Sequence, residues 1–285
     1  MSDSIKTILI TGASGQLGQC IYDIQDRFAG YKMVFASSKE LDITNDESLN
    51  SFFLNQKFEY IINCAAYTNV DQAEKEPEKA FLVNAEGVKK LAMICKAQHS
   101  KLLHISTDYV FDGTKDTPYT ETDIPNPINV YGKSKLQSEL YVQELLTEFF
   151  IIRTSWLYSQ HGKNFYKTIL EKSKNVKELT ITTAEKGTPT NANDLADFIL
   201  YLIVKDIKEY GVYHFSNLGE ATWFDFAKEI LKKNNQLGLI TLKSTDNYPT
   251  FAKRPAYSVL SKQKITEFFE SKLSNWQESL NTLND

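Results

Sequence analysis

The sequence is short of cysteine, of metal-binding patterns and of long apolar runs. Its three cysteines, Cys20, Cys64 and Cys95, form no CxxC pair, and its four histidines form no HExxH or H-x-H arrangement. Isolated thiols without metal spacing are typical of a reducing compartment, so we expect a cytoplasmic protein without a structural metal site. The longest apolar run, residues 198–204, is far shorter than the roughly 20 residues that span a bilayer, and no secretory leader is recognisable.

Neither sign of charge dominates the chain. The 285 residues include 32 lysines and arginines against 36 aspartates and glutamates, which gives a formal charge of −4. This balance provides no electrostatic basis for binding nucleic acid or an anionic membrane, and we expect neither as a partner. Arginine is rare, since Arg27, Arg153 and Arg254 are its only occurrences. A hydrophobic content of 42% indicates a folded globular chain.

Short β-branched or aromatic runs recur along the first 155 residues, at 7–11, 33–36, 60–64, 102–106 and 149–154. Most are separated by stretches with the apolar spacing of a helix, as at Ala80, Val83, Val88, Leu91, Ala92 and Cys95. Apolar strands that alternate with helices predict a parallel sheet covered on both faces. We therefore expect an α/β fold of the Rossmann type, with a doubly wound parallel sheet, over residues 1–156.

The regular alternation weakens after residue 154. The pattern there predicts helices at 164–174 and 193–204, strands at 179–183 and 211–216, and a helix that begins at Thr222, where Asp225 supplies an acidic variant of the capping box. We expect a smaller α+β domain made of residues 157–186 and 217–285, and a segment near 187–216 that returns to the sheet.

A glycine-rich loop follows the first predicted strand. Its sequence is Gly12-Ala13-Ser14-Gly15-Gln16-Leu17-Gly18, a GxxGxxG pattern that leads into a helical pattern. In a dinucleotide-binding loop the first glycine permits a tight turn, the second lets the backbone approach a pyrophosphate, and the third allows close packing of helix on strand. The position between strand and helix favours this interpretation over an ordinary glycine turn.

The end of the second predicted strand bears on the choice of cofactor. It reads Ala36-Ser37-Ser38-Lys39, without an acid at its tip. An acid in this position binds the ribose 2′-hydroxyl of NAD, whereas hydroxyls and a lysine tolerate a 2′-phosphate. We therefore expect NADPH, with NADH as the alternative if Lys39 is only a solvated surface residue. Asp42 and Ile43 follow where a loop can meet the adenine.

Three residues form the predicted catalytic set. Tyr131 and Lys135 are four residues apart in a helical pattern, so their side chains face the same space. A cation one turn away favours the phenolate and lowers a pKa that is ordinarily near 10. Thr107 ends a strand, at the edge where open α/β sheets bind ligands. Together with the glycine loop, this set predicts a reductase in which Tyr131 donates a proton, Lys135 also holds the cofactor ribose, and Thr107 orients the substrate oxygen.

The glycine spacing resembles that of extended short-chain dehydrogenase/reductases, and three longer segments resemble dTDP-4-dehydrorhamnose reductases. These are STDYVFDG at 106–113, NVYGKSK at 129–135 and RTSWLY at 153–158, and further similarity covers nearly the whole chain. The resemblance implies reduction of the C4 keto group of dTDP-4-dehydro-6-deoxy-L-mannose to dTDP-L-rhamnose by NADPH or NADH. This is the last step of dTDP-rhamnose biosynthesis for cell-surface polysaccharide. Residues 1–156 then bind NAD(P), and residues 157–186 and 217–285 bind the sugar nucleotide.

The resemblance also assigns individual roles. The implied cofactor contacts are Gly15, Gln16, Leu17, Asp42, Ile43, Ala65, Ala66, Tyr67, Tyr131 and Lys135. We add the outer two glycines of the loop, Gly12 and Gly18, to this set of cofactor-binding residues. The implied substrate contacts are Thr107, Asp108 and Trp156.

Chemistry supports two of the substrate positions. The guanidinium fork of Arg254 suits the oxygens of a diphosphate, the alternative being an exposed loop arginine. Trp156 follows the fifth predicted strand and offers a flat apolar surface to a deoxysugar, the alternative being an ordinary core tryptophan. We expect Trp223 and Trp276 to pack in the core.

One position departs from the pattern of the family. Some members are said to dimerise around Mg²⁺ through glutamates, and a matching position here is Cys20, which is a poor Mg²⁺ ligand. We therefore expect no Mg²⁺ and a monomer, with a weak dimer as the alternative.

Two other functions stay open. One is a non-catalytic NADP-binding regulatory subunit, which the presence of Thr107, Tyr131 and Lys135 argues against. The other is reduction, epimerisation or dehydration of a different nucleotide sugar. A dehydratase generally needs an additional acid–base pair, and no matching Asp-Glu pair occurs here.

Overall fold

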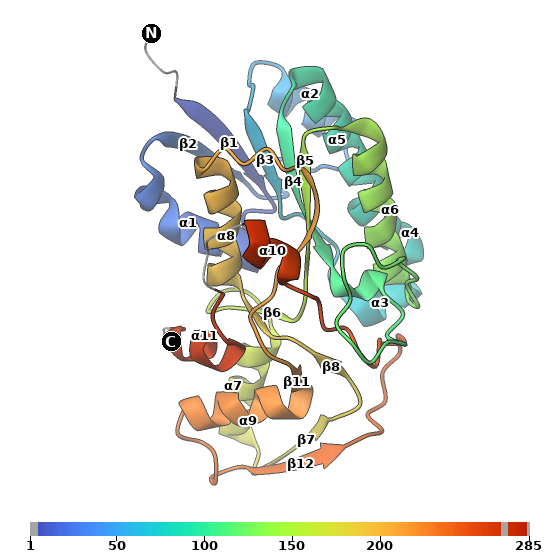
Figure 1. Ribbon diagram of the computed structural model, residues 1–285, viewed down its shortest axis with the longest axis vertical. Helices are drawn as coiled ribbons and strands as arrows, with labels where there is room; N and C mark the ends of the chain where they lie inside the picture. The colour runs from blue at the N-terminus through green and yellow to red at the C-terminus, as the bar shows by residue number, and fades with distance from the viewer. Residues whose placement is uncertain (1–4, 269–272, 284–285) are drawn as a thin grey trace.

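The computed structural model describes residues 5–268 and 273–283. Its main sheet has the strand order β10-β5-β4-β3-β1-β2, and every neighbouring pair is parallel (Figure 1). The strands are β1 (Lys6–Thr11), β2 (Tyr31–Ala36), β3 (Tyr60–Asn63), β4 (Lys101–Thr107), β5 (Phe149–Thr154) and β10 (Gly211–His214). The predicted α/β fold with a parallel central sheet is confirmed.

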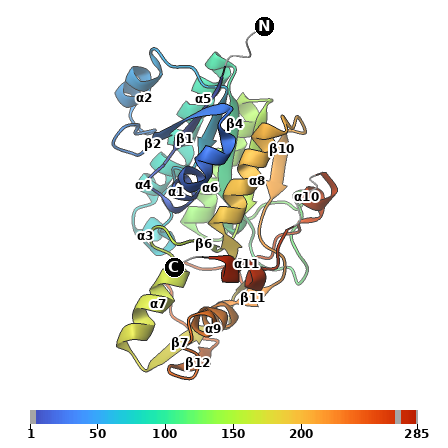
Figure 2. The same cartoon turned by 90° about the vertical axis from the view of Figure 1, so that its left-hand side faces the viewer.

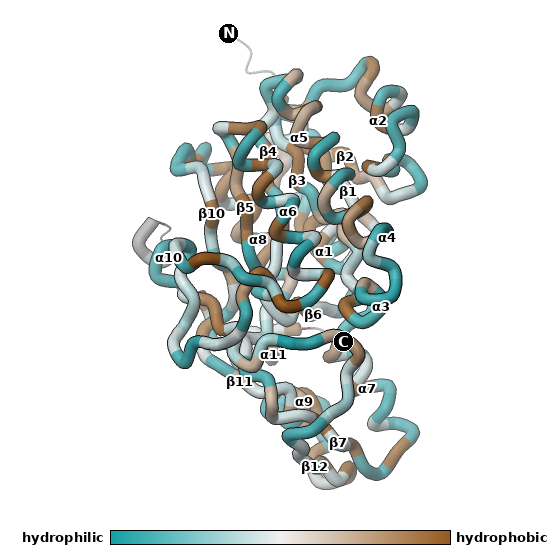
Figure 3. The backbone as a smooth tube through the Cα atoms, turned by 90° about the vertical axis from the view of Figure 1, so that its right-hand side faces the viewer, coloured by the Kyte–Doolittle hydropathy of each residue, from teal (hydrophilic) through white to brown (hydrophobic). Residues whose placement is uncertain are grey.

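Helices cover both faces of this sheet. On one face lie α2 (Asp46–Phe53), α5 (Gly87–Gln98) and α6 (Val130–Leu145), and on the other lie α1 (Gln16–Ile24) and α8 (Ala192–Val204). Successive side chains of a strand point to opposite faces. Within β1, Leu9 therefore packs with the first group of helices, while Ile8 and Ile10 pack with the second. The hydrophobic residues, brown in Figure 3, run along the central strands.

Short helical elements connect the strands and adjust their spacing. They are η1 (Gln25–Phe28), α3 (Val70–Lys75), α4 (Pro77–Phe81), η2 (Leu82–Glu86) and η3 (Asp108–Val110). The helix predicted between residues 80 and 95 is present, but the π turn η2 interrupts it between α4 and α5. Val83, which lies in that turn, is only partly buried.

The later part of the chain forms a smaller body at the carboxyl ends of the strands (Figure 2). Its elements are β6 (Leu157–Tyr158), α7 (Phe165–Asn175), β7 (Glu178–Thr182), β8 (Lys186–Gly187), β9 (Thr190–Asn191), β11 (Ala221–Thr222), α9 (Trp223–Lys233), β12 (Thr241–Thr245) and α11 (Trp276–Thr282). The helix α10 (Gln263–Phe268) returns to the main sheet, where it contacts β10 and buries Ile265 in the core on the α8 side. Strands pair as β7 with β12, β8 with β11, and β6 with β9. The predicted capping box between Thr222 and Asp225 begins α9.

A separate core holds this smaller body together. It contains Tyr158, Tyr166, Phe226 and Trp276, and it is distinct from the two cores on the faces of the main sheet. Trp276 is buried there, as predicted. None of the helices in the described part of the chain is both long and apolar enough to cross a membrane.

Candidate active site

The glycine loop joins the end of β1 to α1. Gly12 has a φ of +61°, in the left-handed region that favours glycine, and a Cβ here would lie 2.6 Å from the backbone nitrogen of Ala65. A Cβ on Gly18 would lie 2.6 Å from the Cα of Ala13. The N–H of Gly15 donates to the carbonyl of Gly12 at 2.9 Å and closes the turn. The tight turn predicted at Gly12 is confirmed, whereas Gly18 packs closely on the loop at Ala13 rather than on the strand itself.

An acid does lie at the tip of β2, contrary to our expectation. Glu40 turns back so that its carboxylate accepts hydrogen bonds from the backbone N–H of Ser37, at 2.9 Å, and from the Ser37 hydroxyl. These bonds lower the pKa of the Glu40 carboxyl. The residue was overlooked because the strand itself ends without an acid, and the turn after it brings Glu40 back to Ser37.

Tyr131 lies in the first turn of α6, where two neighbours fix the helix. The Asn129 side chain accepts the N–H of Gly132 at 2.7 Å and donates to the carbonyl of Lys253 at 2.8 Å. A Cβ on Gly132 would lie 2.1 Å from the carbonyl oxygen of Tyr109, so only glycine lets this turn approach the chain that follows β4. The phenol of Tyr131 is thereby held close to the end of β4.

A cavity of about 620 Å³ lies at the carboxyl ends of the strands. It brings together most of the predicted site residues, namely Gly15, Gln16, Leu17, Ala65, Ala66, Thr107, Asp108, Tyr131, Lys135, Trp156 and Arg254. The other predicted residues do not line it: Gly12, Gly18, Asp42, Ile43 and Tyr67. The predicted catalytic set therefore shares one space with the glycine loop and with the predicted substrate residues.

The predicted residues outside the cavity lining have structural partners. The carboxylate of Asp42 accepts the N–H and the hydroxyl of Thr44, at 2.9 and 2.7 Å, and closes a turn. Ile43 is buried in the core that includes α5. The N–H of Tyr67 donates to the side-chain oxygen of Asn84 at 2.7 Å. Their predicted cofactor contacts stay predictions.

Burial controls the protonation of Tyr131 and Lys135. It raises the pKa of Tyr131 to about 12, against the opposing effect of a hydrogen bond with Thr107. It lowers the pKa of Lys135 to about 8. The expectation that Lys135 lowers the pKa of Tyr131 is not met in this structure, because the ammonium donates to the carbonyl of Ile105 at 2.6 Å and desolvation dominates at the phenol.

Asp108 is a buried carboxyl beside the catalytic threonine. Its Oδ1 accepts the Thr107 hydroxyl at 3.0 Å. Burial raises the Asp108 pKa to about 7, although hydrogen bonds with Ser258 and Thr107 act in the other direction. Near neutral pH this carboxyl can therefore accept or donate a hydrogen bond in the cavity.

Two tryptophans form the wall opposite the glycine loop. Trp156 and Trp223 stack with ring centroids 3.6 Å apart and planes 6° apart, and both line the cavity. Trp156 has a φ of +45°, and a Cβ on Gly187 would lie 2.6 Å from its indole ring. Trp223 packs against the core of the smaller body, as expected, but it also lines the cavity, which the sequence did not indicate. Only the tertiary structure brings the start of α9 to the end of β5.

A second cavity of about 890 Å³ adjoins the first. Arg254 and Lys163 line both cavities and bring positive charge to the junction. The guanidinium of Arg254 donates to Asp71 at 2.8 Å and to the Tyr109 hydroxyl at 3.4 Å, and it is not an exposed loop arginine. Sequence analysis missed Lys163, because nothing distinguishes it from the many surface lysines until the fold places it here.

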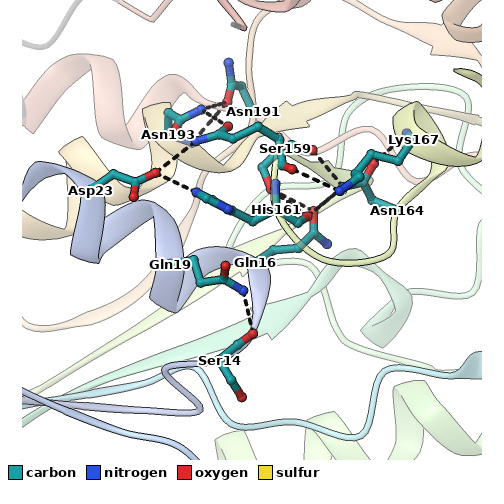
Figure 4. A network of polar contacts seen from close by, with 11 residues as sticks. Ser14, Gln16, Gln19, Asp23, Ser159, His161, Asn164, Lys167, Asn191 and Asn193 are labelled. Atoms are coloured by element: carbon teal, nitrogen blue, oxygen red, sulfur yellow. Dashed lines mark hydrogen bonds and ion pairs between the residues drawn. The ribbon is translucent and has the colours of Figure 1, made fainter. Parts of the chain in front are cut away.

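Lys163 belongs to the segment 159–164, which we call the strap and which bonds to the start of α1 (Figure 4). Gln16, at the start of α1, accepts hydrogen bonds from the side-chain amide of Asn164 at 2.9 Å and from the Ser159 hydroxyl at 3.2 Å. The Gln16 side chain therefore binds the strap, and its predicted cofactor contact stays a prediction. The strap connects the glycine loop to the smaller body.

No group of three histidine, cysteine, aspartate or glutamate side chains within residues 5–268 and 273–283 is placed to hold a metal ion. Cys20 lies in the core, and burial raises the pKa of its thiol to about 12. A protonated, buried thiol is not a ligand for a hard divalent cation.

Comparison with known proteins gives the relationship. The family model described as RmlD substrate binding domain matches residues 6–285. A dTDP-4-dehydrorhamnose reductase of Aggregatibacter actinomycetemcomitans is 40% identical, over 97% of each chain. The chain belongs to the dTDP-4-dehydrorhamnose reductase family.

Solved structures of dTDP-4-dehydrorhamnose reductases agree over almost the whole length. The enzyme of Bacillus anthracis str. Ames, in complex with NADP, has a TM-score of 0.93 at 37% identity, covering 97% of this chain and 98% of that one. An ortholog from Clostridium acetobutylicum ATCC 824 has a TM-score of 0.91 at 39% identity, covering 96% and 97%. The resemblance to dTDP-4-dehydrorhamnose reductases noted in the motifs is confirmed.

Proposed function

We propose that this protein reduces the C4 keto group of dTDP-4-dehydrorhamnose to give dTDP-L-rhamnose, with NADPH as the hydride donor. The observation that carries the proposal is the single cavity that Thr107, Tyr131 and Lys135 line together with the glycine loop and Trp156. The printed names of the relatives, and the NADP in the Bacillus anthracis structure, support the same activity.

The protein's own residues handle the proton and the geometry. Reduced nicotinamide supplies a hydride to the carbonyl carbon. Burial keeps the Tyr131 phenol protonated, so it is ready to donate its proton to the oxygen as negative charge develops there. The Thr107 hydroxyl, bonded to Tyr131, orients the same oxygen. The ammonium of Lys135 supplies positive charge to the cavity and would donate to the ribose hydroxyls of a bound cofactor.

The glycine loop fits a dinucleotide. Gly12 lies so close to Ala65 that no side chain fits, and Gly15 starts α1, whose N-terminal N–H groups suit a pyrophosphate. At the ribose end, Lys39 supports a 2′-phosphate and Glu40 opposes it, so NADH is the competing cofactor. Glu40→Gln should therefore raise the ratio of kcat/KM with NADPH to kcat/KM with NADH. An unchanged ratio would place the 2′-phosphate away from this carboxylate.

The smaller body, together with the residues that follow β4 and β5, supplies the binding surface for the sugar nucleotide. Arg254 and Lys163 match the charge of its diphosphate, Trp156 matches the apolar face of the deoxysugar, and Asp108 matches a sugar hydroxyl. This division assigns cofactor binding to residues 1–156, with the returning segment near 187–216, and substrate binding to residues 157–186 and 217–285.

The setting of the enzyme is part of the same proposal. The three cysteines are free thiols, which supports a cytoplasmic enzyme. The buried Cys20 thiol supports a monomer that does not assemble around Mg²⁺. Size-exclusion chromatography coupled to light scattering, with and without Mg²⁺, tests the monomer.

Product analysis tests the activity against its alternatives. The purified chain is incubated with dTDP-4-dehydrorhamnose and NADPH, and the product is examined by NMR. The proposal predicts dTDP-L-rhamnose, formed in equal amount to the NADPH consumed. A rearranged sugar without NADPH consumption would indicate an epimerase or dehydratase. NADPH binding without any conversion would indicate a regulatory subunit.

A further inference from the structure

A buried series of hydrogen bonds lies behind the cavity and connects three strands to the catalytic helix. It joins Thr11 at the end of β1, Asn63 at the end of β3, His104 in β4 and Ser138 in α6. All four side chains are almost completely buried. The proposed mechanism uses none of them, although polar groups buried together in this way need a reason.

The backbone determines the direction of every bond in the series. The N–H of Ala65 donates to the side-chain oxygen of Asn63 at 3.3 Å, and the Thr11 hydroxyl donates to the same oxygen at 2.6 Å. The Asn63 amide nitrogen therefore faces Nδ1 of His104, at 3.0 Å, and Nδ1 must accept. A neutral imidazole that accepts at Nδ1 carries its proton on Nε2. Nε2 then donates to the Ser138 hydroxyl at 2.9 Å.

The series ends on Lys135. The Ser138 hydroxyl donates to the backbone carbonyl of Lys135 at 2.6 Å, while the Lys135 ammonium donates to the carbonyl of Ile105, next to His104 in β4. The ammonium lies 3.4 Å from Nε2 of His104. The backbone carbonyl of Lys135, through Ser138, and its ammonium are therefore both held against His104 and Ile105 of β4. The other end of the series holds Ala65, which belongs to the predicted cofactor wall.

The charges around this point keep the imidazole neutral. Burial, and then the charge of Lys135, hold the pKa of His104 well below its ordinary range. A proton on Nδ1 would also face the amide protons of Asn63. The groups that act on Lys135 are Glu139 in the same helix and Cys64 after β3, and both favour the ammonium against the effect of burial.

We propose that His104 is a positioning residue, which as a neutral imidazole protonated at Nε2 holds Lys135 in register with the cofactor wall at Ala65. This inference rests on the proposed function, since it gives Lys135 its place in the reaction. The arrangement of the imidazole, however, is a property of the folded chain and is measurable without any substrate.

The first test is made on the wild-type protein. Nitrogen-15 NMR of the histidine rings distinguishes the two neutral tautomers and the imidazolium, and the His104 signals are assigned by their loss in His104→Gln. We expect the tautomer protonated at Nε2 at every pH between about 5.5 and 8.5. An imidazolium within this range, or a proton on Nδ1, overturns the proposal. The result does not depend on which sugar the enzyme reduces.

The second test separates positioning from general stabilisation. His104→Leu should lower kcat by about tenfold or more, with KM for the sugar nucleotide changed by less than about threefold, because a misplaced catalytic group costs rate rather than substrate affinity. His104→Gln, which keeps an N–H donor on a longer side chain, should recover part of kcat. The matched control is His214→Leu. His214 is equally buried, has a similarly lowered pKa and, like His104, lines neither cavity. Its ring instead bonds to the carbonyl of Tyr119 and lies 3.4 Å from the guanidinium of Arg153, with no bond to Lys135 or Ser138.

His214→Leu and His104→Leu should both have a lower Tm than wild type, but the kcat of His214→Leu should stay within about twofold of wild type. The double variant His104→Leu/Ser138→Ala should have a kcat only slightly below that of His104→Leu, because both substitutions interrupt the same series of hydrogen bonds. Equal losses of kcat at His104 and His214, or fully additive losses at His104 and Ser138, overturn the proposal. If the wild-type chain consumes no NADPH with the sugar nucleotide, the proposed function fails while the NMR result still stands.

Discussion

Replacing Glu139 by glutamine should destabilise the fold and change the pH dependence of the reaction together. Glu139 and Arg153 form an ion pair inside the protein, with the carboxylate fully buried and the guanidinium side chain 4% exposed. The nitrogens of Arg153 lie 2.6, 3.0 and 3.2 Å from the carboxylate oxygens, which also accept the Ser106 hydroxyl. Glu139→Gln keeps the shape of the side chain but leaves the arginine charge unpaired.

The expected cost follows from the burial of the pair. Removing one partner of a buried ion pair costs about 3–5 kcal/mol, because the remaining charge stays desolvated. For a chain of this size that corresponds to a drop of about 6–15 °C in Tm. The control is Glu229→Gln, which removes a surface pair with Lys232 and should cost about 0.5 kcal/mol or less.

The pH effect has a definite sign. The Glu139 charge favours the ammonium of Lys135, whose pKa is about 8, so its removal lowers this pKa further. Lys135 then loses its proton at lower pH, and the alkaline limb of the kcat profile should move to lower pH. Thermal unfolding and a pH–rate profile measure the two effects. A variant that melts within about 2 °C of wild type with an unmoved limb would refute this reasoning.

Three further predictions concern the cavity and the glycine loop. Because burial raises the pKa of Asp108 from 3.8 to about 7, the stability associated with this group falls as pH rises through that interval; Asp108→Asn should therefore raise Tm more at about pH 8 than at pH 5, and equal shifts would contradict it. Gly12→Ala should weaken NADPH binding by about tenfold or more in a fluorescence titration, because the added Cβ meets backbone; an unchanged Kd would be the contrary result. Lys163→Met should raise KM for the sugar nucleotide several-fold, whereas Lys167→Met, which removes a bond to Gln160 outside both cavities, should leave it unchanged.

The central sheet was predictable because the composition of each strand is itself typical of a buried β-strand. The runs at 7–11 and 149–154 consist mostly of β-branched and aromatic residues, and parallel strands that are buried on both faces are rich in such residues. The spacing between Tyr131 and Lys135 likewise predicts side chains on one face of a helix, and both line the cavity. Local periodicity was sufficient for these features.

The rest of the site depends on contacts between distant segments. Trp223 becomes part of the cavity only because β11 and β8 pair and set the start of α9 against Trp156. Lys163 lines the cavities because Ser159 and Asn164 of the strap bond to Gln16, which is far away in the sequence. The carboxylate of Glu40 reaches the tip of β2 through a turn that the periodicity of the sequence does not predict.

The predicted effect of Lys135 on Tyr131 failed for an energetic reason. Spacing places a cation one turn from the phenol, but it does not reveal how deeply both groups are buried. Desolvation raises the pKa of the tyrosine and lowers that of the lysine, and the ammonium is directed to the backbone of β4. Rare residue types were a better guide, because Arg254 lines the cavities and Arg153 is held in the core.

The most direct test of the proposed reduction is the consumption of NADPH by wild type and by Tyr131→Phe with dTDP-4-dehydrorhamnose, followed by absorbance. If Tyr131 donates the proton, wild type oxidises NADPH, while Tyr131→Phe binds NADPH with near wild-type affinity and has a kcat lower by about 10² or more. A phenylalanine variant that turns over at the wild-type rate, or a wild-type chain that binds NADPH without consuming it, would contradict the proposed role of this site.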